Sequence, residues 1–130
     1  MKRLIFSLVL LIPVFIGCTL NEKPTEITYF SLSTTAAYGR FLGDEEIILI
    51  DVRTADEFNL KFIPGSINIA LNDVEQKVPS LVTEKNSIIF VICRAGNRSA
   101  SAAKILADLG FSHVYDVGGI NDWPGIVESK

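Results

Sequence analysis

The sequence contains few of the residues that define several common protein classes. Its 130 residues include only two cysteines and one histidine, which excludes a disulfide-rich scaffold and a four-cysteine zinc site. Its 12 Lys and Arg are outnumbered by 15 Asp and Glu, so the clustered positive charge of a nucleic-acid-binding surface is not expected. Hydrophobic residues make up 48% and charged residues 21%. These proportions exclude a disordered, collagen-like or coiled-coil chain, and the length allows one ordinary domain.

Residues 1–17 differ from the rest of the chain. Lys2 and Arg3 precede an apolar run that extends over residues 4–16. This run is too short for a membrane-spanning helix, which needs about 20 apolar residues, and it fits the hydrophobic region of a secretory signal peptide. A buried core helix is the alternative, but the basic start and the lack of a polar face favour a signal peptide over residues 1–17.

The end of this segment resembles a bacterial lipoprotein signal, in which a small residue precedes a cysteine that is acylated and becomes N-terminal. Gly17 and Cys18 fit this pattern, whereas Phe15 stands where Leu is usual. An ordinary signal peptide without lipidation of Cys18 is the alternative. The resemblance implies a lipidated Cys18 and a tether over residues 18–25, with membrane contact through the lipid anchor only. It also implies an extracytoplasmic lipoprotein, periplasmic or at the cell surface, and anchored to the outer membrane if the source has two membranes.

Residues 26–130 alternate short apolar segments with helical patterns. Thr54 with Glu57 three residues later predicts a helix-capping box. Strands separated by such crossovers predict one α/β domain, with a mostly parallel sheet and helices on both faces. We expect strands at 27–30, 47–50, 67–69, 87–92 and 113–117, and helices at 33–41, 54–60, 72–81 and 99–109.

One loop gathers the residues that point to chemistry. Cys93 follows the most apolar predicted strand, at the carboxyl end where open parallel sheets bind ligands. Arg94 and Arg98 flank Gly96 ahead of a helix whose free amides and positive dipole end attract an anion. Gly96 allows a tight curl with inward-pointing amides, and these features should lower the pKa of Cys93. A buried structural cysteine is the alternative, which two Arg, a Gly and a helix start at one place disfavour.

This loop resembles the active-site loop of the rhodanese family, with Cys first, Gly fourth and Arg sixth. Lys61-Phe62 departs from the family, which usually has Gly-His there. The resemblance covers about residues 28–124. Four further segments are similar to family motifs in the same order: Asp51-Val52-Arg53 with Glu57-Phe58, residues 63–69, residues 110–114, and Val117-Gly118-Gly119 with Trp123.

The resemblance implies a rhodanese-like fold and sulfur transfer. The Cys93 thiolate would accept a sulfane sulfur from a small anionic donor such as thiosulfate and pass the persulfide sulfur to cyanide or a thiol. Backbone amides of the loop would cradle that sulfur, and the two arginines would attract the donor or stabilise the loop; the sequence does not divide these roles between them. The expected donor- and persulfide-binding residues are Arg94, Ala95, Gly96, Asn97, Arg98 and Ser99.

Other polar residues are expected to be structural. Asp51 and Arg53 are expected to support the loop as an ion pair or hydrogen-bond network. Ser99 is expected to be the helix N-cap, with a hydrogen bond to the Cys93 sulfur as the alternative. His113 begins a strand with no ligand pattern nearby, so no metal is expected. We also expect no organic cofactor and no nucleic-acid partner, while the oligomeric state stays open with a monomer as the default.

Two other functions compete with a thiosulfate-type sulfurtransferase. The first is a persulfide carrier or binding module with a dedicated protein partner and little turnover of its own. The second is a cysteine-dependent phosphatase or arsenate reductase, which would use a Cys-x5-Arg loop. Cys93 and Arg98 form the shorter Cys-x4-Arg pattern, which suits a single sulfur atom better than a tetrahedral oxyanion.

Overall fold

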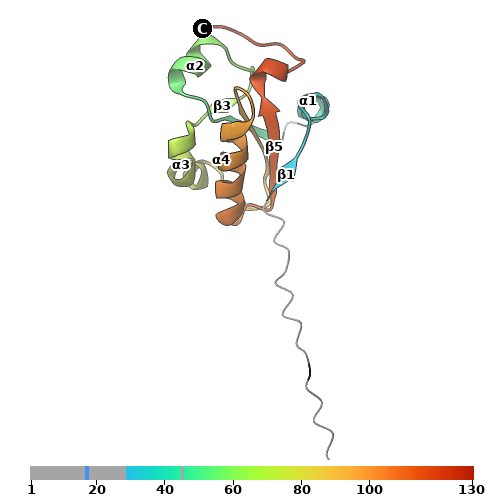
Figure 1. The fold of residues 1–130 in the computed structure, drawn as a ribbon, viewed down its shortest axis with the longest axis vertical. Coiled ribbons are helices and arrows are strands. Elements are labelled where there is room, and N and C mark those ends of the chain that lie inside the picture. The colour runs from blue at the N-terminus through green and yellow to red at the C-terminus, as the bar shows by residue number, and fades with distance from the viewer. Residues whose placement is uncertain (1–16, 18–28, 45) are drawn as a thin grey trace, which may run out of the picture.

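A computed structural model describes residues 17, 29–44 and 46–130 of the chain. Apart from Gly17, the predicted signal peptide lies outside the described residues, as do Cys18 and the predicted tether. Within the described part, no helix has both the length and the apolar character needed to cross a membrane. From β1 onward the chain alternates strands and helices, as the sequence pattern predicts (Figure 1).

The described elements correspond to the predicted ones, and the differences lie mainly at their ends. The strands are β1 (Phe30–Ser31), β2 (Ile48–Asp51), β3 (Ile67–Asn68), β4 (Ile88–Cys93) and β5 (His113–Gly119). The α-helices are α1 (Thr34–Gly43), α2 (Ala55–Leu60), α3 (Val74–Leu81) and α4 (Asn97–Asp108). Two short 3₁₀ helices are η1 (Leu71–Asp73) and η2 (Ile120–Asp122).

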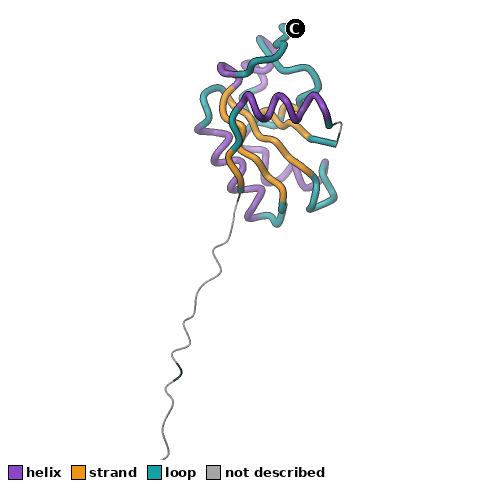
Figure 2. Tube along the Cα trace, turned by 90° about the vertical axis from the view of Figure 1, so that its right-hand side faces the viewer, coloured by secondary structure: helices purple, strands orange, loops and turns teal. Residues whose placement is uncertain are grey.

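The strands form one sheet in the order β1-β5-β4-β2-β3, and all neighbouring strands run parallel. This arrangement confirms the predicted α/β class. Helices lie on both sides of the sheet (Figure 2), with α1 on one face and α3 and α4 on the other. Because the strands are parallel, β2, β4 and β5 bring their carboxyl ends to the same edge of the sheet.

The central strand β4 separates two hydrophobic cores, because its side chains alternate between the two faces of the sheet. Ile89, Val91 and Cys93 belong to the core that α3 and α4 cover. Phe90 and Ile92 belong to the core beneath α1. All five residues are at most 1% exposed, which explains why this strand reads as an uninterrupted apolar run.

The pairing of β4 with β5 is irregular at the carboxyl end. Val91 lies opposite Asp116, but Cys93 lies opposite Gly119, so the register shifts between these pairs. The extra residue on β5 is accommodated as a bulge, which bends the strand. Gly118, with a φ of 86°, lies within this irregular stretch. The bulge thereby places a glycine backbone directly beside Cys93.

Candidate active site

Cys93 is a free cysteine at the last position of β4. Only 1% of its surface is exposed. Its Sγ atom accepts a hydrogen bond from the backbone amide of Gly96 at 3.0 Å. The sulfur therefore lies within hydrogen-bonding distance of the loop that follows the strand, and the loop amides can stabilise its charge.

The loop after Cys93 enters α4 earlier than the sequence predicts. Gly96 occupies the N-cap position in the left-handed conformation, with a φ of 107°, and the helix begins at Asn97. Glycine adopts this conformation at little cost. The expectation that Ser99 caps the helix is therefore wrong, because the chain is already helical when it reaches Ser99. The Ser99 hydroxyl instead lies 3.5 Å from Cys93 Sγ, as the alternative expectation had it.

The environment lowers the pKa of the Cys93 thiol below its ordinary value. Burial of the sulfur acts in the opposite direction and raises the pKa. Hydrogen bonds outweigh burial, and they come from the Ser99 side chain and from the backbone amides of Ser99, Gly96 and Ala95. Donors aimed at the sulfur stabilise its charged form. The loop therefore favours the thiolate, which is the nucleophilic form of cysteine.

Arg98 is held by Glu57 of α2. Its two terminal nitrogens donate to the two carboxylate oxygens at 2.6 Å and 2.9 Å, a bidentate geometry that only arginine provides. The hydrogen bond from Arg98 is the main reason why the pKa of Glu57 falls to about 2, and the same contact raises the pKa of Arg98. Of the two roles that the sequence left open, the geometry gives Arg98 the stabilisation of the loop.

Asp51 and Arg53 form the predicted ion pair beneath this loop. Arg53 Nη2 lies 2.7 Å from Asp51 Oδ2, and both side chains are at most 5% exposed. The same nitrogen also donates to the Lys61 carbonyl at 2.6 Å, and Nη1 reaches the Glu57 carbonyl at 3.4 Å. The pair therefore fixes the position of α2, which in turn presents Glu57 to Arg98.

A cavity of about 290 Å³ lies beside the loop. Arg94 contributes to its wall and makes no ion pair within the described part of the chain. The charges of Arg53 and Arg98 are both paired with carboxylates, whereas Lys61, like Arg94, has no ion-pair partner among the residues that the structure describes. Arg94 and Lys61 can therefore supply positive charge for an anion in this cavity. The lining residues are Arg53, Glu57, Leu60, Lys61, Arg94, Ile120 and Asn121.

Another cavity is larger, at about 510 Å³, but lies away from Cys93. Ile67 and Ile69 line it together with Gln76, Lys77, Ser80 and Leu81 of α3. No residue of the cysteine loop contributes to its wall. Size alone therefore does not locate the chemistry in this molecule.

Gly118 and Gly119, the last two residues of β5, pack against the cysteine loop. A Cβ atom on Gly119 would lie 2.8 Å from the Ala95 Cα and even closer to the Arg94 carbonyl oxygen. Such contacts are too short for carbon atoms, so only glycine allows β5 to approach the loop this closely. The sequence motif contains both glycines, but it does not show that Gly119 packs against the cysteine loop.

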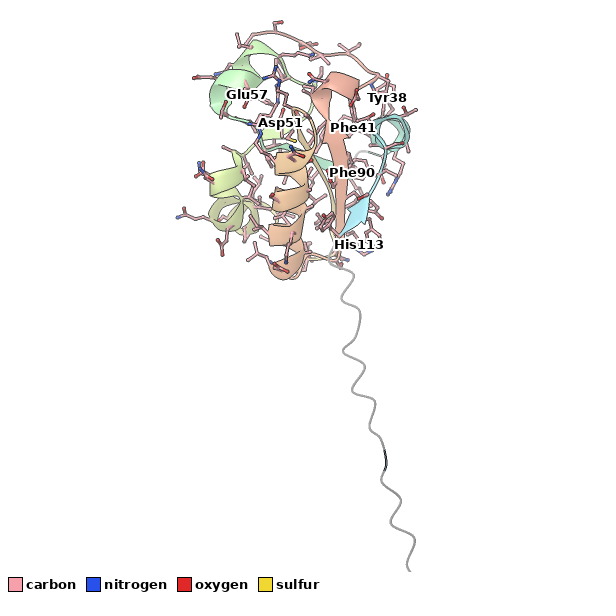
Figure 3. The ribbon with its side chains drawn as sticks, viewed as in Figure 1. Tyr38, Phe41, Asp51, Glu57, Phe90 and His113 are labelled. Carbon is pink, nitrogen blue, oxygen red and sulfur yellow. The ribbon has the colours of Figure 1, made fainter. Side chains whose placement is uncertain are left out.

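The other residues that the sequence singled out differ in their distance from Cys93. Asn97 is the first residue of α4, and it and Ala95 are exposed. Among the described residues, neither the Asn97 nor the Arg98 amide has a hydrogen bond to Cys93 Sγ. His113 lies at the opposite end of the domain from Asp51 and Glu57 (Figure 3). In the described part of the chain, no three His, Cys, Asp or Glu side chains form a group that could hold a metal ion.

Sequence reasoning assigned no site role to Asp116 or Lys61, and it noted Glu57 for its capping box and family motif. Asp116 is a charged residue within the last predicted strand, and this position was the available sign that it has a specific role. The pairing of Glu57 with Arg98 had no local signal, because the two residues are 41 positions apart.

Residues 34–125 match the Rhodanese-like domain family, and the chain belongs to this family. It is 37% identical over 73 residues to the thiosulfate sulfurtransferase PspE of Escherichia coli, which covers 56% of this chain and 70% of that protein. It is 35% identical over 99 residues to the putative sulfurtransferase YtwF of Bacillus subtilis, covering 76% of this chain and 94% of the relative. At the level of the family, these relatives support sulfurtransferase activity.

Solved structures show the same fold. A rhodanese with anions from E. coli superimposes with a TM-score of 0.62 at 32% identity, covering 65% of this chain and 99% of that one. A rhodanese-related protein from Thermoplasma volcanium gives a TM-score of 0.67 at 31% identity, covering 78% of this chain and 100% of the other. The rhodanese fold predicted from the sequence motifs is thus confirmed.

Proposed function

We propose that this protein is a thiosulfate-type sulfurtransferase in which Cys93 carries the transferred sulfur. The Cys93 thiolate attacks the outer sulfur of the donor, the bond between the two donor sulfurs breaks, and sulfite leaves with the electron pair. Cys93 then holds a persulfide whose outer sulfur carries the negative charge. A thiophilic acceptor such as cyanide or a thiolate takes that sulfur and regenerates the Cys93 thiolate.

The observation that carries this proposal is the position of Cys93 Sγ beneath the loop amides. The Gly96 amide donates to it at 3.0 Å, and the same curl of backbone offers donors to an outer sulfur. Arg94 and Lys61 in the neighbouring cavity provide attraction for an anionic donor. The relative PspE is named a thiosulfate sulfurtransferase, which supports the same donor class here.

A second candidate is a persulfide carrier that delivers sulfur to a dedicated protein partner. A relative at 37% identity, YrkF of B. subtilis, is named a putative sulfur carrier protein. The chain covers 46% of that relative, so the comparison concerns only part of it. A carrier would form the persulfide but turn over slowly with small acceptors.

The decisive experiment is thiosulfate-to-cyanide sulfur transfer by the purified chain beside Cys93→Ala and Cys93→Ser. Thiocyanate from the wild type and from neither variant supports the sulfurtransferase. Persulfide on Cys93, seen as the mass of one added sulfur atom without turnover, supports the carrier. Absence of both products overturns sulfur transfer, and hydrolysis of an aryl phosphate in the same preparation would support the phosphatase alternative.

We further propose an extracytoplasmic location with a lipid anchor at Cys18. Support comes from the sequence alone: Lys2 and Arg3, the apolar run of residues 4–16, and Gly17 before Cys18. Radiolabelled palmitate should enter the wild-type protein in a bacterial host and not the Cys18→Ser variant. Equal labelling of both, or of neither, would exclude lipidation at Cys18.

A further inference from the structure

The buried Ser99 hydroxyl lies between Cys93 and a carboxylate that the mechanism above does not use. Ser99 Oγ is 3.5 Å from Cys93 Sγ and 2.6 Å from Asp116 Oδ1. The carbonyl oxygens of Gly96 and Gly118 are further acceptors, at 2.9 Å and 3.3 Å. A hydroxyl has one proton to donate, so these acceptors compete for it.

Asp116 is the strongest of these acceptors. A distance of 2.6 Å is typical of a charge-assisted hydrogen bond between a hydroxyl and a carboxylate. The Gly118 amide donates to the same Oδ1 atom at 3.1 Å and fixes the carboxylate beneath Ser99. With its proton directed mainly to Asp116, Ser99 Oγ can accept a hydrogen bond from the neutral Cys93 thiol, and it gives the thiolate only a weak contact at 3.5 Å.

We propose that Asp116 is a positioning residue for Cys93: its carboxylate holds the Ser99 proton and so competes with the thiolate for a hydrogen bond. This role rests on the sulfurtransferase function proposed above. A thiolate that receives only a weak contact from this hydroxyl relies mainly on the backbone amides, stays more basic and is therefore the stronger nucleophile. After transfer, Sγ is bonded to the outer sulfur and has no charge of its own, so it no longer needs the proton. Ser99 keeps its proton throughout.

Other charged groups lie near Cys93, but they do not hold the Ser99 hydroxyl. Arg98 of α4 is paired with Glu57 of α2, and Arg53 with Asp51 at the end of β2. Arg94 belongs to the loop itself. Within the described residues, none of these side chains contacts the Ser99 hydroxyl, whereas Asp116 of β5 does. An exchange of Asp116 for Asn therefore changes the direction of one hydroxyl and leaves the other charge pairs in place.

The test is a titration of the Cys93 thiolate by its ultraviolet absorbance. The full chain carries Cys18→Ser in every variant, so that Cys93 is the only thiol. Asp116→Asn should lower the midpoint by about one pH unit, because the released hydroxyl turns to the thiolate and a hydrogen bond to a charged group is gained. Ser99→Ala alone should raise the midpoint by much less than one pH unit, because the hydroxyl makes only a weak contact with the sulfur at 3.5 Å while Asp116 holds its proton. It should also abolish most of the effect of Asp116→Asn.

Turnover gives an independent measurement. A thiolate whose pKa is about one unit lower should react about threefold more slowly with thiosulfate at alkaline pH, where it is fully ionised. The acid limb of the rate profile should move to lower pH by the same amount as the titration midpoint. Thermal unfolding followed by circular dichroism shows whether each variant is folded.

Three results would overturn the role of Asp116. One is an unchanged midpoint in folded Asp116→Asn. The second is an equal shift with and without Ser99→Ala, which would mean that the charge of Asp116 acts directly on the thiolate. The third is a midpoint raised by about one unit in Ser99→Ala alone, because Ser99 would then donate to sulfur in the wild type. The titration needs no sulfur donor, so failure of the proposed function would be seen separately, as a wild type without persulfide.

Discussion

The Arg98 guanidinium and the Glu57 carboxylate join two parts of the chain that are 41 positions apart, through hydrogen bonds of 2.6 Å and 2.9 Å. Glu57 also accepts from the Thr54 amide at 3.0 Å and completes the capping box of α2. One carboxylate therefore holds both the start of α2 and the arginine beside Cys93. The cysteine loop depends on this contact for its position.

The contact predicts a loss of stability in acid. The pKa of Glu57 lies at about 2 in the folded protein and at 4.5 for the ordinary group. A lowered folded-state pKa contributes stability that is fully present above pH 4.5 and is lost as the pH falls toward about 2. The free energy of unfolding of the wild type, measured with urea, should therefore decrease as the pH falls from 4.5 to about 2.

Glu57→Gln is the matched control for that pH dependence. Its free energy of unfolding should be lower than that of the wild type at neutral pH, and the difference should shrink as the pH falls below 4.5. Glutamine retains the shape of the side chain but cannot ionise. A difference that stays constant down to about pH 2 would contradict the ionic role of Glu57.

Arg94 should act mainly on the binding of the sulfur donor. Arg94→Ala removes an unpaired cation from the wall of the cavity, so KM for thiosulfate should rise about tenfold, with a smaller change in kcat. Lys77→Ala removes one positive charge from an exposed pair on α3 and should leave both constants unchanged. Equal effects of the two variants would show that net charge, not Arg94, attracts the donor.

Gly119 should tolerate no side chain. Gly119→Ala places a Cβ 2.8 Å from the Ala95 Cα, so either the loop or β5 must shift, and sulfur transfer should fall at least about tenfold because the geometry around the nucleophile is displaced. Gly39→Ala is the matched control, since a Cβ there meets nothing within 4 Å. It lies inside α1 and should stabilise the protein by about 0.5–1 kcal/mol. A fully active Gly119→Ala would refute the close packing of the cysteine loop against β5.

Arg53 should be among the most important polar residues for stability. Arg53→Ala leaves Asp51 buried without its ion-pair partner and should lower the free energy of unfolding by about 3–5 kcal/mol. Lys77→Ala, which breaks a pair with 61% and 43% exposed side chains, should cost less than about 1 kcal/mol. Comparable losses in the two variants, measured by urea unfolding, would mean that the Asp51–Arg53 pair is not a structural centre.

Much of this architecture could be predicted from local sequence. The apolar run of β4 and the Thr54–Glu57 capping box are encoded by neighbouring residues, and both are present in the structure. The convergence of Cys93, Gly96 and a helix start also has a local signature. Such features depend on spacing along the chain, which a sequence displays directly.

Other parts of the site depend on how distant segments pack. The partner of Arg98 could not be predicted, because many carboxylates were available and only the fold selects Glu57. The contact of Asp116 with Ser99 depends on the pairing of β5 with β4, which places Asp116 opposite Val91 and has no separate signal in the sequence. The start of α4 was misplaced because a left-handed Gly96 replaced the expected serine cap.

The parallel direction of the strands also decides which way the domain faces. β1 runs parallel to β5, so β1 begins toward the end of the sheet at which His113 starts β5 (Figure 3). Cys93 is the last residue of the parallel strand β4 and lies at the opposite end of the sheet. An attachment ahead of β1 would thus hold the domain at the end of the sheet opposite Cys93. A membrane on that side would leave the cavity beside Arg94 open to diffusing donors and to the active sites of other proteins.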